Sequence, residues 1–334
     1  MSSFISLLCF NVSHEISKPD NYTIENCFFS VHSDSISLIQ IIVPRVALYL
    51  ANCNFYKCDI EQTDGCCFFI ASSCSVFQLS KVCASYCYTG YLKFGQFGLH
   101  YGDKNSNSTL LLSSISHCYN ESNVGIDTIS FHKSNAFFVE SNISDNVENC
   151  YCGLRVSDVE KCAISFITLA KNSVLESELF YLFSNYELNI RMVNCISNDG
   201  NKEMVFHIGG TVEIKESVFF NNTGTLFHFG EEGKMLIYDC VLAHHGIKFN
   251  TNKYETIMIQ YSFMNSLNIN YNISCYEQNK CSDPRNYTMI IVISLFIIIS
   301  FSVMVLTKQM KPRNENEIVF GEIVNNNNVY SEFG

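Results

Sequence analysis

Apolar and polar residues alternate along many short segments of this chain. The segments TVEIKES (211–217) and LNIRMVN (188–194) place apolar side chains on one face and polar side chains on the other. This period of two is typical of β-strands that are buried on one side. Gly, Asn and other polar residues separate such segments. The pattern therefore predicts an all-β chain of short strands joined by turns.

The segments also repeat. An aliphatic or aromatic residue is followed three positions later by a small residue, two later by an apolar residue and three later by Asn or a substitute. Copies begin at Ile24, Leu50, Leu110, Phe138, Ile164, Ile214 and Ile237. We place a further copy around Met192 and Cys195, slipped by one position, and another over residues 259–265; residues 66–100 match worst.

Copies recur at intervals of roughly 23–28 residues, or small multiples of that length. A unit of this length with two or three short strands is one coil of a parallel β-helix, in which stacking of successive coils builds a continuous core. Equivalent residues then form ladders, such as Cys27 over Cys53. We expect Phe219 to point inward, Asn222 to bond to neighbouring coils, and His207 to stack on His228.

One copy resembles a known repeat. Gly209–Val212 (GGTV) followed by Phe219–Asn222 (FFNN) is similar to the paired GGA[ILV] and FxxN repeats of polymorphic membrane proteins and related surface proteins of parasitic protists. The resemblance covers about residues 20–270. It implies a right-handed parallel β-helix of the pectin-lyase-like type, exposed at a cell surface and serving adhesion.

An apolar run near the end of the chain predicts a membrane span. The 18 residues 289–306 contain no charged residue, no Gly and no Pro. As an α-helix they extend about 27 Å, close to the ~30 Å hydrocarbon core of a bilayer. The predicted organisation is an N-terminal segment (1–19), a β-helix ectodomain (20–270), a juxtamembrane stalk (271–288), one transmembrane helix (289–306) and a polar cytoplasmic tail (307–334).

Basic residues indicate the orientation of this span. Lys308, Lys311 and Arg313 follow it directly, which favours a cytoplasmic C-terminus and an ectodomain outside the plasma membrane. At the other end, residues 4–10 (FISLLCF) lack a preceding basic residue. They are either a weak signal peptide or the first strand of a chain whose start is missing.

Charge and motifs limit the possible functions. The formal net charge is -11, so nucleic acid is not an expected partner. No phosphate-binding loop, nucleophile elbow or cofactor motif is present. Glu231 and Glu232 are interpreted as turn charges. Neither a catalytic residue nor a cofactor is predicted, although the same fold supports polysaccharide lyases and hydrolases.

The chain has 17 cysteines, an odd number that leaves at least one unpaired in a disulfide-forming compartment. Their local spacing does not match zinc-binding knuckles, so no metal site is predicted. Most occupy repeat positions and are interpreted as small core residues. Disulfides are expected among the clustered ones: Cys66, Cys67 and Cys74; Cys83 and Cys87; Cys150 and Cys152; Cys275 and Cys281.

The remaining candidate sites are short motifs. N-glycosylation sequons occur at Asn11, Asn21, Asn107, Asn120, Asn142, Asn221, Asn272 and Asn286. Tyr330 and Phe333 form a Y-x-x-Φ pattern typical of endocytic sorting signals, which adaptors bind. The leading hypothesis is a surface protein that binds a protein or glycan ligand. The alternatives are a polysaccharide-active enzyme and a structural coat protein.

Overall fold

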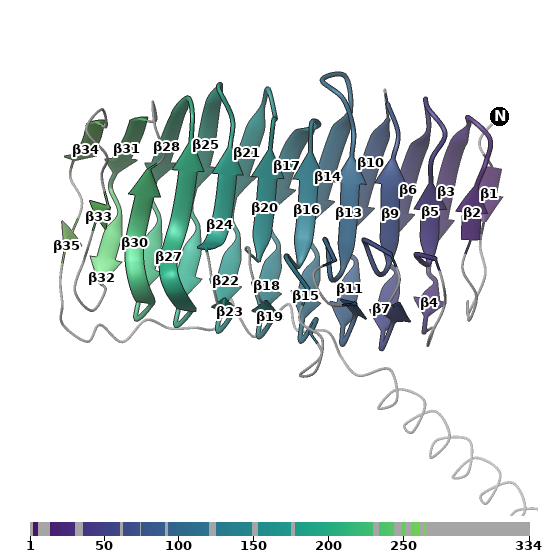
Figure 1. Cartoon of the computed structure of the whole chain (residues 1–334), viewed down its shortest axis with the longest axis horizontal. Helices are drawn as coiled ribbons and strands as arrows, with labels where there is room; N and C mark the ends of the chain where they lie inside the picture. The colour runs from purple at the N-terminus through teal and green to yellow at the C-terminus, as the bar shows by residue number, and fades with distance from the viewer. Residues whose placement is uncertain are drawn as a thin grey trace, which may run out of the picture. The chain divides into compact units, whose positions relative to one another are not determined.

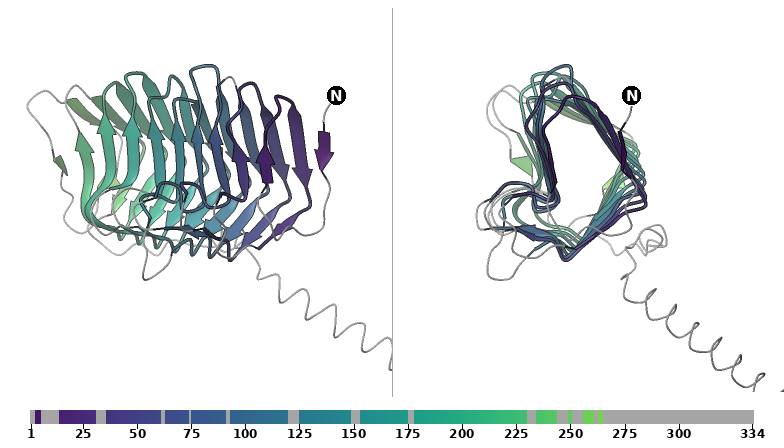
Figure 2. Two further views of the ribbon diagram at one scale, coloured as in Figure 1. Left: turned by 45° about the vertical axis from the view of Figure 1, so that its right-hand side comes forward. Right: turned by 90° about the vertical axis from the view of Figure 1, so that its right-hand side faces the viewer.

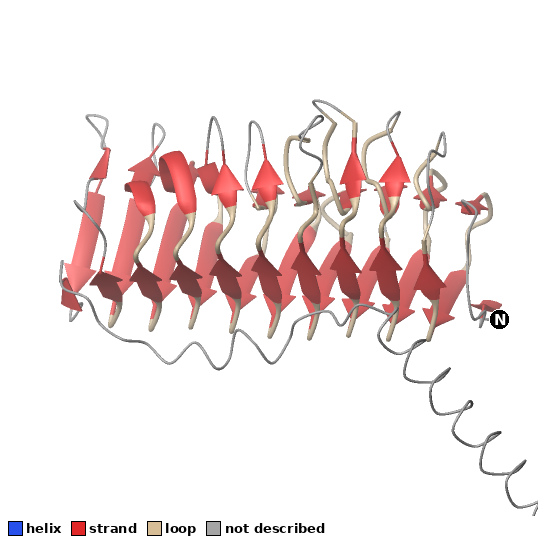
Figure 3. Cartoon of the chain, turned by 90° about the horizontal axis from the view of Figure 1, so that it is seen from below, coloured by secondary structure: helices blue, strands red, loops and turns tan. Residues whose placement is uncertain are grey.

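The computed structural model shows a parallel β-solenoid (Figure 1). It describes residues 3–5, 14–30, 36–60, 63–73, 75–90, 93–119, 125–148, 153–174, 178–229, 234–243, 249–250, 256–260 and 263–264. All of them belong to one compact unit, Met1–Ser282. Within these ranges the regular elements are all strands, as Figure 3 shows in red. The predicted fold class, an all-β parallel solenoid, is therefore confirmed.

Three long parallel sheets form its walls. Sheet A contains β1 (Ser3–Ile5), β3 (Asn21–Glu25), β6 (Ala47–Ala51), β10 (Val76–Ser80), β14 (Asn107–Leu111), β17 (Asn135–Val139), β21 (Cys162–Ser165), β25 (Glu187–Arg191), β28 (Thr211–Lys215), β31 (Lys234–Tyr238) and β34 (Thr256–Gln260). Sheet B contains β4 (Phe28–Phe29), β7 (Asn54–Tyr56), β11 (Cys83–Ser85), β15 (Ser114–Ser116), β18 (Asn142–Ser144), β22 (Thr168–Ala170), β26 (Asn194–Ile196), β29 (Val218–Phe220), β32 (Val241–Ala243) and β35 (Phe263–Met264).

Sheet C closes the coil. Its strands are β2 (His14–Ile16), β5 (Ile39–Ile41), β9 (Phe68–Ala71), β13 (Gly98–Tyr101), β16 (Ile129–His132), β19 (Val147–Glu148), β20 (Leu154–Ser157), β23 (Ser173–Val174), β24 (Glu178–Phe183), β27 (Asp199–Ile208), β30 (Thr223–Phe229) and β33 (Phe249–Asn250). A two-stranded sheet, β8 (Asp59–Ile60) and β12 (Tyr88–Thr89), lies between sheets B and C in the chain. The right-hand view of Figure 2 shows the three walls end-on.

The repeat anchors form one ladder of sheet A. Ile24 pairs with Leu50, Leu110 with Phe138, and Ile214 with Ile237. The ladder also contains Leu79 and Ile190, which supply the copies in the two difficult regions. The predicted copy around Met192 was therefore displaced: it begins at Ile190.

Corners between the sheets need residues in the left-handed backbone region. Glu216 and Asn221, with φ of 51° and 53°, precede the inward-facing Ser217 and Asn222. Gly209 has a φ of +86°, and a Cβ on Gly210 would lie 2.2 Å from the backbone oxygen of Tyr186. The two glycines of the GGTV motif thus occupy positions that exclude a side chain.

The interior is mainly apolar, with ladders of hydroxyl, thiol and amide groups at the corners, and further buried polar groups include His100, Asp127 and Glu148. Phe219 is 1% exposed, as predicted, and packs edge-on to Phe227 with ring centroids 5.2 Å apart. Cys27 and Cys53 are neighbours in one ladder, also as predicted. The prediction that His207 stacks on His228 was wrong, because the strand register is offset by one residue: His228 pairs with Phe206, and His207 pairs with Phe229.

Two predictions concern the ends of the chain. Residues 3–5 form β1, which pairs with β3, so this part of the N-terminal segment is a strand. In the part of the chain that the structure describes, no helix has the length and apolar character needed to span a bilayer. The predicted span at 289–306 lies outside that part.

Candidate functional site

A groove runs over the outer face of sheet C. Its floor consists of outward-facing side chains from five consecutive strands, β9, β13, β16, β20 and β24, and its wall comes from the connections that carry Asp64 and Phe94. The cavity has a volume of about 560 Å³. It is lined by Asp64, Phe69, Ala71, Phe94, Leu99, Tyr101, His132, Arg155, Ser157, Asp158, Tyr181 and Phe183.

The strand register aligns these side chains in two rows. Leu99 pairs with Phe69 and Ser130, and Arg155 pairs with Ser130 and Tyr181. The second row runs two residues further along each strand and contains Ala71, Tyr101, His132, Ser157 and Phe183. The alternation within each strand sends both rows outward, away from the core.

Arg155 lies between two aromatic rings. Its guanidinium carbon is 5.1 Å from the Phe94 ring centroid and 5.0 Å from that of Tyr181. Its Nη1 is 3.8 Å from the Asp127 carboxylate, which is completely buried. Such cation–π contacts and the ion pair hold the guanidinium in one orientation. Arg155 thus provides a pre-positioned cationic, planar donor in the groove.

The acid behind Arg155 belongs to a buried pair. A carboxylate oxygen of Asp127 accepts a hydrogen bond from the backbone N–H of Gly95. Burial raises the pKa of Asp127 to about 6, although Arg155 acts in the opposite direction. Burial, and then repulsion from Asp127, raise the pKa of Glu148 well above its ordinary value. Asp127 is therefore mainly ionised at pH 7, while the pKa shift favours protonated Glu148.

His132 and Tyr101 form the other end of the groove. Their rings stack with centroids 5.2 Å apart, and Lys133 Nζ lies 5.2 Å from the Tyr101 ring centroid. His132 Nε2 is 2.6 Å from Ser130 Oγ, and its Nδ1 contacts Ser157 Oγ. Burial lowers the pKa of His132 to about 3, with Arg155 adding to the effect, so the imidazole is neutral. Both ring nitrogens have partners, which suits a supporting role for His132 beneath Tyr101.

This arrangement is suited to binding. The groove offers aromatic faces, one fixed guanidinium, and the carboxylates of Asp64 and Asp158 at its edge. Asp127 and Glu148, both 0% exposed, lie behind the surface, where a substrate in the groove does not reach them. Sequence reasoning missed the groove. The available signal in the sequence was that outward-facing positions of the sheet C strands hold aromatic residues several times, at Phe69, Tyr101 and Tyr181.

The predicted glycosylation sites fall at different places. Asn21 begins β3 and is exposed, Asn107 is partly buried in β14, and Asn221 is exposed at a corner. Asn142 is buried, and its Nδ2 donates to Ser144 Oγ at 3.4 Å, so in the folded chain it is inaccessible to a transferase. Asn11, Asn120, Asn272 and Asn286 lie outside the described residues, as do the sorting-signal residues Tyr330 and Phe333 and the acidic pair Glu231 and Glu232.

The cysteines differ partly from expectation. Cys66, Cys67 and Cys87 are buried free thiols, so the expectation that these three take part in disulfides is wrong, and Cys83 is not bonded to Cys87. Cys83 is disulfide-bonded. The other described cysteines, Cys27, Cys53, Cys58, Cys118, Cys162, Cys195 and Cys240, are buried free thiols, in agreement with the prediction of core residues. Cys74, Cys150, Cys152, Cys275 and Cys281 lie outside the described residues.

Comparison of the chain with family models, with curated proteins and with solved structures yields no match. The resemblance to polymorphic-membrane-protein repeats therefore rests on the GGTV and FFNN residues alone.

Proposed function

We propose that this chain is a single-pass cell-surface protein whose right-handed β-helix ectodomain binds an extracellular glycan through the groove on sheet C. The observation that supports it best is the position of Arg155 between Phe94 and Tyr181, in a groove whose other aromatic side chains face solvent. Ligand sites commonly combine apolar walls with a few fixed polar groups, and this groove has that composition.

A sugar fits the chemistry of the groove. The C–H faces of a pyranose ring pack on aromatic rings, and Tyr101, 43% exposed, offers such a surface. Hydroxyl and carboxyl groups of a glycan hydrogen-bond to a guanidinium and to carboxylates, here Arg155, Asp64 and Asp158. The solenoid holds these groups on adjacent strands, so little ordering is required on binding.

The test is binding of the full-length chain to a glycan panel, followed by measurement of Kd for the best ligand. Tyr101→Ala is expected to weaken binding at least about tenfold, because an aromatic anchor is removed. Tyr186→Ala is the matched control: this tyrosine is 52% exposed and lies outside the groove lining. Absence of glycan binding, or equal losses in both variants, contradicts the proposal. Release of new reducing or unsaturated ends would instead favour the enzyme alternative.

The membrane topology is tested separately. Protease treatment of intact cells is expected to remove the solenoid and to spare an epitope at residues 330–334. Digestion of that epitope with survival of the solenoid reverses the proposed orientation.

A further inference from the structure

One ladder of the solenoid changes its residue type partway along. At the corner after sheet B, each coil turns a single side chain inward behind a residue with positive φ. From the N-terminal side these inward residues are Cys58, Cys87, Cys118, Asn146, Asn172, Asn198 and Asn222, all buried. The asparagines bond to one another and to backbone groups. The cysteines occupy the equivalent positions in the coils that carry the longer connections.

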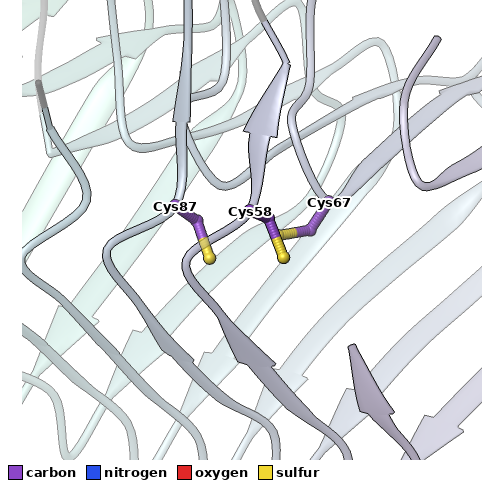
Figure 4. Close-up of side chains that lie close together, drawn as sticks. All are labelled: Cys58, Cys67 and Cys87. Atoms are coloured by element: carbon purple, nitrogen blue, oxygen red, sulfur yellow. The ribbon is translucent and has the colours of Figure 1, made fainter. Parts of the chain in front are cut away.

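Two further cysteines enter the interior at the same coils. Cys66 and Cys67 directly precede β9 and are completely buried. The sulfur atoms of Cys58, Cys67 and Cys87 all lie within 4.8 Å of one another. Figure 4 shows the three side chains next to one another. The thiol of Cys118 interacts with that of Cys87, and the Cys66 thiol donates to the backbone oxygen of Cys58 at 3.1 Å. Five thiols thus form one buried cluster.

We propose that Cys58, Cys67 and Cys87 form a three-thiolate structural site for a thiophilic divalent cation such as Zn²⁺. Zinc thiolate sites have Zn–S distances of about 2.3 Å, which place neighbouring sulfurs ~3.8 Å apart. The sulfurs of these three cysteines all lie within 4.8 Å of one another, close to that spacing. Cys118 contacts Cys87 but lies outside this group of three sulfurs, so it is not counted as a ligand.

The ligand type selects the ion and its role. Thiolates favour Zn²⁺ over Mg²⁺ or Ca²⁺, and complete burial of the three sulfurs keeps a substrate away from the ion, so its role is structural. Binding requires the sulfurs as thiolates and releases the protons that they carry, so affinity rises with pH.

A metal at this site would cross-link two successive coils, which in this region are otherwise joined by the hydrogen bonds of short strands. Cys58 and Cys87 belong to successive coils, and Cys67 lies on the connection that leads into sheet C. A metal bound to Cys58 and Cys67 joins the two ends of the connection between β8 and β9, and Cys87 ties this connection to the next coil. Because all the sulfurs are buried, the ion enters during folding. It therefore stabilises the folded chain and is retained against a chelator.

The experiment uses the full-length chain purified under reducing conditions from zinc-supplemented cells, and a second sample refolded with Co²⁺. We expect one metal per chain, and near-ultraviolet thiolate-to-cobalt charge-transfer bands in the refolded sample. The double variant Cys58→Ser/Cys87→Ser is expected to lose both, whereas Cys162→Ser retains them. Cys162 is the matched control, because it is equally buried and its thiol lies apart from the cluster.

X-ray absorption at the zinc edge of the wild-type chain provides a test that does not depend on a variant folding. A first shell of sulfur at about 2.3 Å supports the site. A shell of nitrogen or oxygen, a metal content near zero, or a disulfide among Cys58, Cys67 and Cys87 in protein purified without reductant overturns the proposal. Equal metal content in the double variant and in Cys162→Ser overturns it as well.

Discussion

Asn198 and Asn222 occupy the same corner of successive coils and are joined twice. The Oδ1 atom of Asn222 accepts hydrogen bonds from the backbone N–H and from the Nδ2 of Asn198, both at 3.0 Å. The Nδ2 of Asn222 donates to the backbone oxygen of Cys195 at 2.8 Å. The expectation that Asn222 bonds to a neighbouring coil is confirmed. The side-chain amide of Asn222 thus supplies hydrogen-bond partners to the backbone groups of Asn198 and Cys195, which would otherwise be buried at the corner without a partner.

Removing an amide from the middle of this ladder tests its contribution to stability. Asn172 Oδ1 accepts from Asn146, and its Nδ2 donates to the backbone oxygen of Ile143 at 2.9 Å. Asn172→Ala leaves several buried groups without partners and is expected to lower the free energy of unfolding by about 2–5 kcal/mol. Urea unfolding measures this. Asn189→Ala, at an exposed position of β25, is the control; equal losses in both variants would refute the ladder's role.

The inward-facing side chain of β29, Phe219, gives a second prediction. Phe219→Ala removes a fully buried ring and leaves a cavity, so we expect a loss of ~3–5 kcal/mol. Lys215→Ala changes a side chain that is exposed and paired with Glu213 on the outer face of sheet A, and the unfolding midpoint should hardly move. Thermal melting of both variants is the measurement. A large loss in Lys215→Ala would show that the strand phase is wrong.

The raised pKa of Glu148 predicts that the free energy of unfolding depends on pH. Its pKa is raised in the fold above the ordinary value of 4.5, so the folded state binds the proton more tightly than the unfolded state. The stability it contributes is fully present below about pH 4.5 and falls as pH rises toward the folded pKa, by at most about 1.4 kcal/mol per pH unit. Glu148→Gln should remove this decline. Unfolding free energies of both proteins between pH 5 and 8 provide the comparison, and parallel curves would contradict the prediction.

The fold was largely predictable because every position of the sheet A ladder holds a large apolar residue, Ile, Leu or Phe. Ile24, Leu50, Ile214 and Ile237 stand in register, and their spacing reveals the coil. The copy at Leu79 was missed because Val82 stands where most coils have Cys or Ser, and Ala84 in β11 stands where most have a large apolar residue. Coil length also varies, from 31 residues between Val82 and Ser113 to 22 between Ile237 and Ile259, because corners accept insertions.

The candidate sites could not be predicted in the same way. The residues of the groove come from five strands and from three connections, those of Asp64, Phe94 and Asp158, and none forms a local motif. In the thiol cluster, Cys58 and Cys87 lie a whole coil apart in the sequence, so knuckle spacing is the wrong criterion for them. Only the coil register brings them together.

The central claim, that the sheet C groove is the ligand-binding surface, is tested most directly by amide hydrogen exchange of the full-length chain with and without its best glycan ligand. The account predicts that bound ligand slows exchange in β13, β20 and β24, whose side chains line the groove. Slowed exchange confined to sheet A strands such as β28 and β31, with no change in sheet C, would contradict it.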